Sequence, residues 1–378
     1  MKVYVTGIAA ITPLADNIKQ TYELLLQGRS ALGEIEHSEK YRYKKTSQIR
    51  YSLSRNHNLY QNRAEILLEK AIVDAIKDAG LDHEIQNLEP LTSIGSMFSS
   101  NTDIEEKYLL QESSFSTYAT SDLVNTVVNR LNLSGPRFTI STACSSGATA
   151  IGAAYRQLRR GKADIAICGG VDAFRTLAHC CMSSLRILDS ENVKPFGADR
   201  NGTILGEGVG ILILESEERV LKRHTYAQMV GFGCSCDAQS MSRPDTEGML
   251  RAIKKSIKGL SIAGPVYINA HGTGTIANDI SELNAISKTF CNYADEIYVS
   301  STKGAIGHTV GAAGAIEAII SVLALKYNYL PPNINVKNYE EIANITIIKE
   351  RALKQNVEYS ISNSFGFGGN NSAIIFRK

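Results

Sequence analysis

The sequence carries little net charge and contains no long apolar run. Its 40 Lys and Arg residues and 38 Asp and Glu residues leave a formal net charge of +2 at pH 7. Because no block of basic residues stands out either, a nucleic-acid partner is not indicated. No apolar run reaches the roughly 18 residues that a membrane span requires. The longest candidate, Ala312–Leu325, contains Gly314 and Glu317 and is typical of a buried helix.

Targeting and disulfide signals are also missing. Met1–Gly7 predicts a strand rather than a signal peptide. The seven cysteines are odd in number and follow no spacing framework, so disulfide bonds are not expected. Cys180 adjoins Cys181, and one residue separates Cys234 from Cys236, which is too close for a usual zinc site without a second paired motif. We therefore expect a cytoplasmic protein with reduced thiols, no metal and no membrane contact.

The order of the expected elements indicates an α/β protein. Strand-like and helix-like segments alternate, and the pattern restarts at about Tyr226, which favours largely parallel sheets. With 378 residues, the chain is long for one core and suggests two domains or two halves of one large fold. We place the division between residues 1–224, which contain Cys144, and residues 225–378, which contain two histidines near glycines.

The expected elements follow from apolar spacing and from glycine punctuation. Glu105–Ser116, charged at its start and polar at its end, is expected to be a lid-like or interface segment. Strands are expected at Lys2–Ile8, Ser93–Met97, Arg137–Ile140, Ile165–Cys168, Ile211–Glu215, Val266–Ala270, Glu296–Val299 and Ser372–Phe376. Helices are expected at Asn17–Leu26, Arg63–Ala79, Leu123–Leu131, Ala148–Leu158, Thr246–Ser256 and Ser281–Phe290.

Cys144 stands in the segment around which the rest of the chain is organised. An apolar run ends at Ile140, and a helix-prone segment of small residues begins at Ala148, which predicts a strand, a sharp turn and a buried helix. At a helix start, unpaired N–H groups and the helix dipole favour a nucleophilic thiolate. The alternative is that Cys144 is a small buried core residue, as many free cysteines are.

Two histidines follow expected strands. His271 begins the sequence His-Gly-Thr-Gly-Thr, and His308 ends the sequence Lys-Gly-Ala-Ile-Gly-His. Ligands bind at the carboxyl ends of strands in open α/β sheets, although a single histidine is more often a hydrogen-bonded structural residue. Together with Cys144, the two imidazoles suit covalent acyl chemistry, in which a thiolate attacks and the imidazoles stabilise developing charge.

Asn363–Asn371 combines phenylalanine with glycine near the end of the chain. Its Phe-Gly-Phe-Gly-Gly sequence supplies adaptable backbone with free N–H groups. The segment is either an oxyanion donor or simply a tight turn.

These motifs, taken in order, resemble the β-ketoacyl-[acyl carrier protein] synthases, and most closely the elongating type II condensing enzymes with a Cys-His-His triad. The resemblance runs nearly end to end. It rests on Val5–Gly7 with Thr12–Leu14, the nucleophile motif at 141–147, Pro195–Gly202 with Gly206–Gly208, His271–Thr275 with Asn278, Asp279 and Glu282, Lys303–His308, and the Phe-Gly-Phe-Gly-Gly turn. Initiating synthases and chalcone-type enzymes carry Asn where this chain has His308 and fit less well.

The resemblance implies a thiolase-like fold, with two similar halves in a five-layered αβαβα sandwich, and a dimer. Cys144 would take the acyl chain from the phosphopantetheine arm of an acyl carrier protein. The backbone N–H groups of Cys144 and Phe367 would form the oxyanion hole. His271 and His308 would bind the malonyl thioester carbonyl and stabilise the enolate left when carbon dioxide departs.

Further roles carried over from the family concern residues around this triad. Lys303 would pair with Glu282 and fix the electrostatics around His308; the pair could also be a structural ion pair, and both can hold at once. Arg186 matches a position that meets the carrier, or is a solvated surface arginine. Thr273, Thr275 and Ser242 match positions that hold the pantetheine arm.

The chain also departs from the family pattern. It is a few dozen residues shorter than typical members, in part after Phe98, which affects the surface where a carrier would dock. Gly197 replaces a common acidic residue, and Thr203 replaces a common aromatic residue. Phe98 and Met182 are larger or more flexible than the pocket residues they align with. We expect them to line the acyl pocket and to favour short to medium chains, although Phe98 could equally pack in a dimer interface.

The resulting prediction is a decarboxylative condensation that gives a 3-oxoacyl-[acyl carrier protein] in fatty-acid biosynthesis, without a cofactor of its own. The alternative within the class is a specialised ketosynthase of a polyketide or polyene-pigment pathway that works with a noncatalytic partner subunit. A homodimer and a heterodimer therefore both remain open. A noncatalytic scaffold would lack the nucleophile, and a thiolase would lack the His-Gly-Thr-Gly-Thr and Lys-Gly…Gly-His pair.

Overall fold

The computed structural model describes residues 1–35, 38–50, 63–99, 119–220, 223–240, 242–292 and 296–378, so that the expected segment Glu105–Ser116 lies outside the described residues. The strands are β1 (Val3–Ile11), β2 (Gly33–Glu34), β3 (Lys45–Thr46), β4 (Leu91–Gly95), β5 (Arg137–Ile140), β6 (Ile165–Asp172), β7 (Gly208–Ser216), β8 (Ala227–Cys236), β9 (Val266–Asn269), β10 (Ile297–Ser300), β11 (Tyr329–Leu330), β12 (Ile345–Ile347), β13 (Leu353–Lys354), β14 (Tyr359–Gly366) and β15 (Asn370–Arg377). The α-helices are α1 (Ile18–Leu26), α2 (Arg63–Asp78), α4 (Thr120–Arg130), α5 (Ser146–Arg159), α6 (Thr176–Ser184), α7 (Thr246–Ser256), α8 (Ile276–Phe290), α9 (Lys303–Ile306) and α10 (Ala313–Tyr327). Two short 3₁₀ turns, η4 (Val310–Ala312) and η5 (Phe367–Gly369), adjoin the site described below.

In the described residues, eleven strands form one hydrogen-bonded sheet in the order β12-β10-β9-β14-β15-β8-β1-β7-β6-β4-β5. The two halves of the chain meet where β8 pairs with β1. From this junction outward, each half has two antiparallel pairings followed by parallel ones. The sheets are therefore mixed, and the expectation of largely parallel sheets is wrong for the inner strands. β14 and β15, for example, must be antiparallel because only the short turn η5 connects them.

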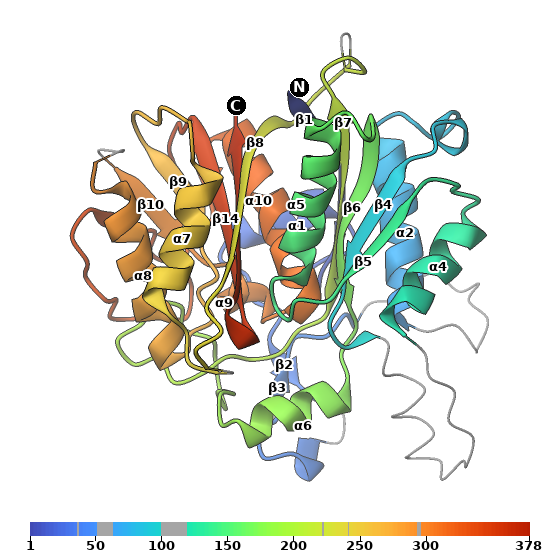
Figure 1. The fold of residues 1–378 in the computed structure, drawn as a ribbon. Helices are drawn as coiled ribbons and strands as arrows, with labels where there is room; N and C mark the ends of the chain where they lie inside the picture. Colours follow the sequence, from blue (N-terminus) through green and yellow to red (C-terminus); the bar gives the residue numbers. More distant parts are fainter. Residues whose placement is uncertain (36–37, 51–62, 100–118, 221–222, 241, 293–295) are drawn as a thin grey trace.

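The elements are stacked in five layers, which Figure 1 shows nearly edge-on from left to right. α7 and α8 cover the outer face of the second half's strands, and α2 and α4 cover the outer face of the first half's strands. Between the two sets of strands lie α5 and α10, each of which contacts strands of both halves. This is the predicted αβαβα sandwich, and its two halves share one plan.

The central helices fit between the strands because small residues let the backbones approach. A Cβ on Gly147 of α5 would lie only 2.7 Å from the Gly311 carbonyl oxygen, so no side chain fits there. The segment Val310–Tyr327 is apolar enough to span a membrane, with a mean hydropathy of 1.6, but 89% of it is buried within the protein. This segment is therefore buried in the core, as the sequence predicts for Ala312–Leu325.

Most expected elements are present, with shifted ends. α7 has the expected bounds, whereas α8 begins at Ile276, five positions before the expected Ser281. Thr275 lies just before α8, so the histidine loop leads directly into this helix.

Candidate active site

Cys144 lies in a sharp turn between β5 and α5. Ala143 adopts the left-handed conformation with φ 53°, which is uncommon for a residue other than glycine. The turn is held by Ser146, whose N–H and hydroxyl both donate to the Ala143 carbonyl oxygen, at 3.0 Å and 2.5 Å. This geometry places the Cys144 thiol at the start of the central helix, with 4% of the residue exposed.

The ionisation of Cys144 differs from the sequence expectation. Burial raises the pKa of this thiol to about 11, although the Lys303 ammonium and the backbone N–H groups of Phe367 and Cys144 act in the opposite direction. The helix dipole was expected to favour thiolate, but α5 begins only at Ser146, and desolvation of the charged form dominates. The free thiol is therefore protonated at neutral pH.

The rings of His271 and His308, which both line the pocket, are arranged edge to face. Their centroids are 5.3 Å apart and their planes are inclined by 84°. Glu282 of α8 fixes the His271 loop, because its two carboxylate oxygens accept the N–H groups of His271 and Gly272, each at 2.8 Å. Ile204 fixes the other loop, where its carbonyl oxygen accepts the His308 N–H at 2.7 Å.

Both imidazoles are neutral at physiological pH. Burial lowers the pKa of His271 and of His308 well below the usual value, and the nearby Lys303 charge lowers both further. The Val310 N–H donates to His308 Nδ1 at 3.3 Å, so this ring carries its proton on Nε2. In the described part of the chain, Nε2 of His308 is buried without a partner and is thus available to donate to a ligand.

The Phe-Gly-Phe-Gly-Gly segment packs against the Cys144 turn. A Cβ on Gly366 would lie 3.1 Å from the Cys144 nitrogen, so this strand end packs directly on the turn. Gly368 and Gly369 have φ values of 74° and 75°, which only glycine adopts readily. The tight-turn and oxyanion-donor interpretations are compatible, because the turn brings the Phe367 N–H to the Cys144 sulfur.

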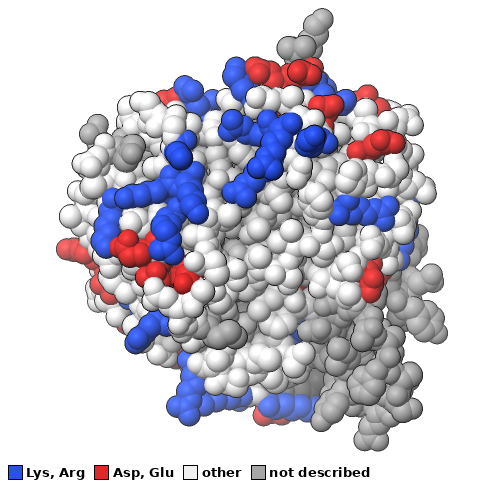
Figure 2. Space-filling view, in the orientation of Figure 1, with Lys and Arg blue, Asp and Glu red and all other residues white. Residues whose placement is uncertain are grey.

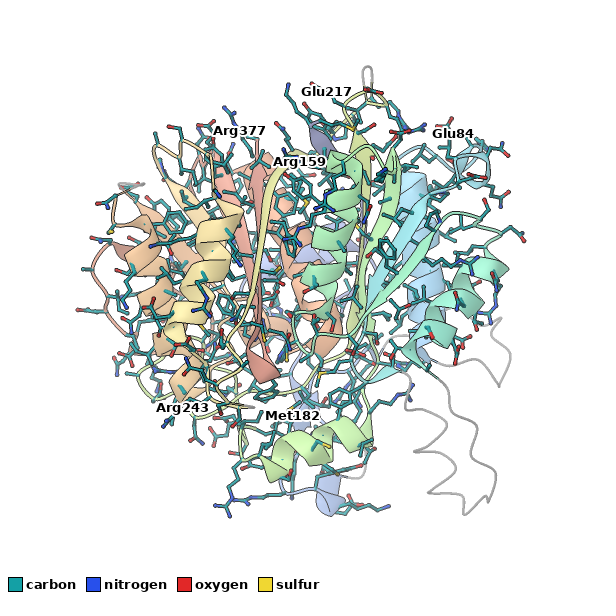
Figure 3. All side chains as sticks on the ribbon, in the orientation of Figure 1. Glu84, Arg159, Met182, Glu217, Arg243 and Arg377 are labelled. Carbon is teal, nitrogen blue, oxygen red and sulfur yellow. The ribbon has the colours of Figure 1, made fainter. Side chains whose placement is uncertain are left out.

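One pocket of about 150 Å³ joins these groups. Its lining includes Met182, Leu205 and Val310, which belong to one apolar cluster with α6, and also the polar residues Asp237 and Arg243. Figure 3 shows Met182 on α6 and Arg243 at the edge of the second half. The residues singled out in the sequence that line this pocket include Cys144, Met182, Thr203, Ser242, His271, Thr273, Thr275, Asn278, His308, Phe365 and Phe367.

Comparisons with known proteins agree with this geometry. Residues 1–219 match the family described as β-ketoacyl synthase, N-terminal domain, and residues 226–337 match its C-terminal domain. This chain belongs to the β-ketoacyl synthase family. It is 34% identical over 409 residues to a 3-oxoacyl-[acyl-carrier-protein] synthase 2 of Synechocystis sp., covering 100% of this chain and 98% of that protein. It is 32% identical over 414 residues to the synthase 2 of Vibrio harveyi, with the same coverage of 100% and 98%.

Solved structures show the same architecture. The ishigamide ketosynthase/chain length factor has a TM-score of 0.90 and 28% identity, covering 100% of this chain and 99% of that one. A type II polyketide ketosynthase solved in complex with its acyl-carrier protein has a TM-score of 0.88 and 26% identity, again covering 100% and 99%. The thiolase-like fold expected from the sequence is thus confirmed.

The expected ion pair between Lys303 and Glu282 is not present, and the prediction is wrong. The Lys303 ammonium pairs with the carboxylate of Glu317 on α10, and the side chains of both are almost fully buried. Glu282 is engaged elsewhere, since it accepts from the His271 loop and, at 3.2 Å, from the Asn363 side chain. Lys303 nevertheless acts as expected on the histidines, because its charge lowers the pKa of both.

Two other expected residues of the synthase lie outside the pocket lining. Phe98 does not line the pocket but packs in the apolar cluster behind its wall, together with Met182 and Val310. Arg186 follows α6, is exposed, and borders a separate surface recess with Lys40 and Arg42. A role for Arg186 in carrier docking stays a prediction.

Several pocket residues of the synthase escaped sequence analysis. Leu205 and Val310 line the pocket, but they are ordinary hydrophobic residues without a distinguishing pattern. Asp237 also lines the pocket and accepts from the Asn371 side chain at 2.7 Å. The Asn-Asn pair after the glycine turn is a signal that could have pointed to this contact.

Proposed function

We propose that this synthase catalyses decarboxylative Claisen condensation of an acyl thioester with malonyl-[acyl carrier protein] in fatty-acid biosynthesis. The observation that carries the proposal is the convergence of Cys144, His271 and His308 in one pocket, with the Phe367 N–H at the sulfur. Full-length relatives named 3-oxoacyl-[acyl-carrier-protein] synthase 2 support this pathway. The alternative, a polyketide or pigment ketosynthase, fits less well, since the similar structures of that kind are only 26–28% identical.

In the first half-reaction, Cys144 Sγ attacks the acyl thioester of the carrier. Negative charge develops on the carbonyl oxygen, where the N–H groups of Cys144 and Phe367 stabilise it. The pantetheine sulfur then leaves and takes up the proton that the thiol has lost. Because the pKa of Cys144 is raised to about 11 in the free protein, this proton must depart as the bond to carbon forms.

In the second half-reaction, the two histidines act as neutral donors. The malonyl thioester oxygen accepts from His308 Nε2 and from His271, and it carries the charge released when carbon dioxide departs. The resulting enolate carbon attacks the Cys144 thioester, and the thiolate leaves to regain a proton. Burial supports this role, because it keeps both imidazoles uncharged and their donor protons free of competing water.

We infer that the substrates arrive on an acyl carrier protein. A related ketosynthase has been solved in complex with its acyl-carrier protein. The hydroxyls of Thr273, Thr275 and Ser242 line the polar end of the pocket and suit the amide groups of a pantetheine arm. The seven free cysteines support the cytoplasm as the proposed location, since it keeps thiols reduced.

We further infer a homodimer that forms along β5. Among the described strands, β5 is at the end of the sheet and pairs only with β4, so one side of its backbone is open to another strand. All four of its residues are only half-buried. Figure 2 shows a broad area with few charged side chains over α5 and the lower part of β5, between the basic residues above and the grey atoms below. Light scattering of the purified chain tests this, since a monomer at micromolar concentration would contradict it.

The central test is Cys144→Ala compared with Cys291→Ala, which removes an exposed thiol outside the pocket. After incubation with carrier protein that bears an acyl thioester, intact-protein mass spectrometry should show one acyl adduct on the parent protein and on Cys291→Ala. Cys144→Ala should show none and should give no 3-oxoacyl product, while its unfolding midpoint stays near that of the parent. An adduct on another cysteine, with turnover retained, would overturn the assignment.

A further inference from the structure

Asp172, at the end of β6, is a buried carboxylate that lies outside the reacting groups. Only 1% of it is exposed. Its Oδ1 accepts from successive groups of the loop after β4, which we call the Phe98 loop (residues 96–99). These donors are the Ser96 hydroxyl at 2.9 Å, the N–H groups of Met97, Phe98 and Ser99 at 3.2, 2.9 and 3.1 Å, and the Ser99 hydroxyl at 2.8 Å.

The other oxygen of Asp172 ties this loop to the segment that follows His308. Oδ2 accepts the Gly311 N–H at 2.7 Å and the Met97 N–H at 3.1 Å. A Cβ on Gly311 would lie 2.5 Å from Oδ2 and 2.9 Å from the Met97 nitrogen, so the two backbones and the carboxylate are in direct contact. The Asp172 carboxylate is the acceptor in every one of these contacts. If Asp172 were protonated, its O–H group would oppose one of these donors.

Between Gly311 and His308 the chain is strained. Val310 has φ 50°, which is unfavourable for a β-branched residue. In this conformation its N–H donates to His308 Nδ1 at 3.3 Å, and that contact places the imidazole proton on Nε2. Backbone conformations of this kind cost about 1–3 kcal/mol and persist only where the surroundings hold them. The bond from Gly311 to Asp172 holds the turn together with backbone bonds, among them that from the Ala312 N–H to the Thr309 carbonyl oxygen at 3.0 Å.

We propose that Asp172 is a positioning residue, which holds the strained Val310 turn so that His308 presents its Nε2–H to the malonyl thioester. The inference rests on the proposed function of the pocket. The same carboxylate holds the Phe98 loop behind the acyl wall, so one side chain braces the decarboxylation site and the wall at which the acyl chain would lie. Asp172 touches no substrate and acts on His308 through Gly311 and Val310, while its charge separately raises the pKa of the Cys144 thiol.

Asp172→Asn separates these two tasks. The loop side offers the larger number of donors, so the amide oxygen should stay with residues 96–99 and the NH₂ group should face the Gly311 N–H. Two donors then oppose each other, and the Val310 turn loses its brace. Because a displacement of about 1 Å can cost a hundredfold in rate, we expect malonyl decarboxylation to fall tenfold to a hundredfold. Acyl loading of Cys144 should stay within about twofold of the parent rate.

Two matched controls accompany this variant. Ser99→Ala removes a hydroxyl that donates to Asp172 Oδ1 and accepts the Ala173 N–H at 3.3 Å, but it keeps the contact of Asp172 with Gly311, so decarboxylation should be retained. Glu215→Gln alters another fully buried carboxylate, which accepts from Thr6 and Arg219 at the far end of β7. It should lower stability without changing the ratio of decarboxylation to loading. Asp172→Asn should also cost less in a Val310→Gly background, because glycine adopts φ 50° without strain.

The tautomer of His308 gives a readout that a merely structural role would not move. In ¹⁵N-histidine-labelled parent protein near pH 7, His308 should appear neutral with its proton on Nε2, and Asp172→Asn should give a mixture of tautomers. The inference is overturned if the parent shows the Nδ1–H form or a charged ring, whether or not the variant folds. It is also overturned if decarboxylation and loading fall by the same factor. Absence of decarboxylation by the parent protein would instead refute the proposed function.

Discussion

Removing one partner of the Lys303–Glu317 pair should destabilise the protein far more than removing both. The exposed fractions of the two side chains are 1% and 2%, the lowest of the ion pairs in the described residues. Glu317→Met leaves the Lys303 ammonium buried without a carboxylate, which costs about 3–5 kcal/mol in comparable cases. That is a large part of the roughly 5–15 kcal/mol by which a protein is stable. Lys303→Met combined with Glu317→Met should recover most of this loss, because apolar side chains of similar volume need no partner.

The reverse single variant, Lys303→Met, should be pH-dependent. In the parent protein, burial raises the pKa of Glu317 from its usual 4.5 to about 7, against the opposing effect of Lys303. Because the pKa of Glu317 is higher in the folded protein than in the unfolded chain, its protonated form stabilises the folded state. This stabilisation is fully present below pH 4.5 and is lost as the pH rises through about 7. Without Lys303 the pKa rises further. The variant should therefore approach the parent's stability at pH 5 and fall well below it at pH 9.

Urea unfolding at a fixed protein concentration measures these free energies, and alkylation of Cys144 by iodoacetamide measures the catalytic consequence. The Lys303 charge lowers the pKa of the Cys144 thiol, so the double variant should shift the alkylation midpoint upward from about 11. The double variant should thus be stable yet less reactive. Equal destabilisation of the Glu317→Met variant and the double variant would refute the coupling, and an unmoved midpoint would refute the action of Lys303 on the thiol.

Three further predictions concern the residues around the pocket. His308→Ala should lower carbon dioxide release from malonyl-carrier more than it lowers loading of Cys144, because the enolate forms only in the second half-reaction; loss of loading with decarboxylation retained would reverse the assigned roles. Arg186→Glu should raise the KM for carrier-bound substrate, increasingly so at low salt, while turnover of a small pantetheine thioester stays unchanged. Equal effects on both substrates would assign Arg186 to structural support. Phe98→Ala should extend the loading profile toward longer chains, since each methylene that gains a buried place is worth roughly 0.8 kcal/mol. A loading series from two to sixteen carbons measures this, and an unchanged profile would mean that Phe98 does not limit chain length.

The reacting groups were predictable because short local motifs position them. Cys144 follows β5 at a sharp turn of small residues, whereas His271 and His308 lie in glycine-rich segments that follow the neighbouring strands β9 and β10. The carboxyl ends of neighbouring strands converge at one edge of a sheet, and the pocket joins both histidines to Cys144. Alternation of strands and helices indicated the α/β class, and the resemblance to the synthase family implied the five layers. The direction of the inner strands was not predictable from alternation alone, because it depends on which strands share a short connection.

Contacts between layers account for the main errors. Glu282 and Glu317 both lie on helices near Lys303 in the fold, and the sequence offers no means of choosing between them. The choice is made by packing, since the two backbone N–H groups at His271 and Gly272 occupy Glu282 and leave Glu317 to face the ammonium. The ionisation of Cys144 was misjudged for a related reason, because burial outweighs the helix start and burial depends on the whole fold.

Strained backbone at the site was equally hidden, because sequence analysis looks for glycine where φ is positive. Ala143, Phe196 and Val310 all adopt φ between 50° and 62° without being glycine. Each is held by a specific contact: Ala143 by the hydroxyl of Ser146, and Phe196 by the buried carboxylate of Asp279, which accepts its N–H at 2.8 Å. Val310 has the corresponding support in the bond from Gly311 to Asp172. Three of the unfavourable conformations in the described residues thus lie around Cys144 and the histidine loops. They persist because the Ser146 hydroxyl donates to the Ala143 carbonyl oxygen, and because the carboxylates of Asp279 and Asp172 accept backbone N–H groups.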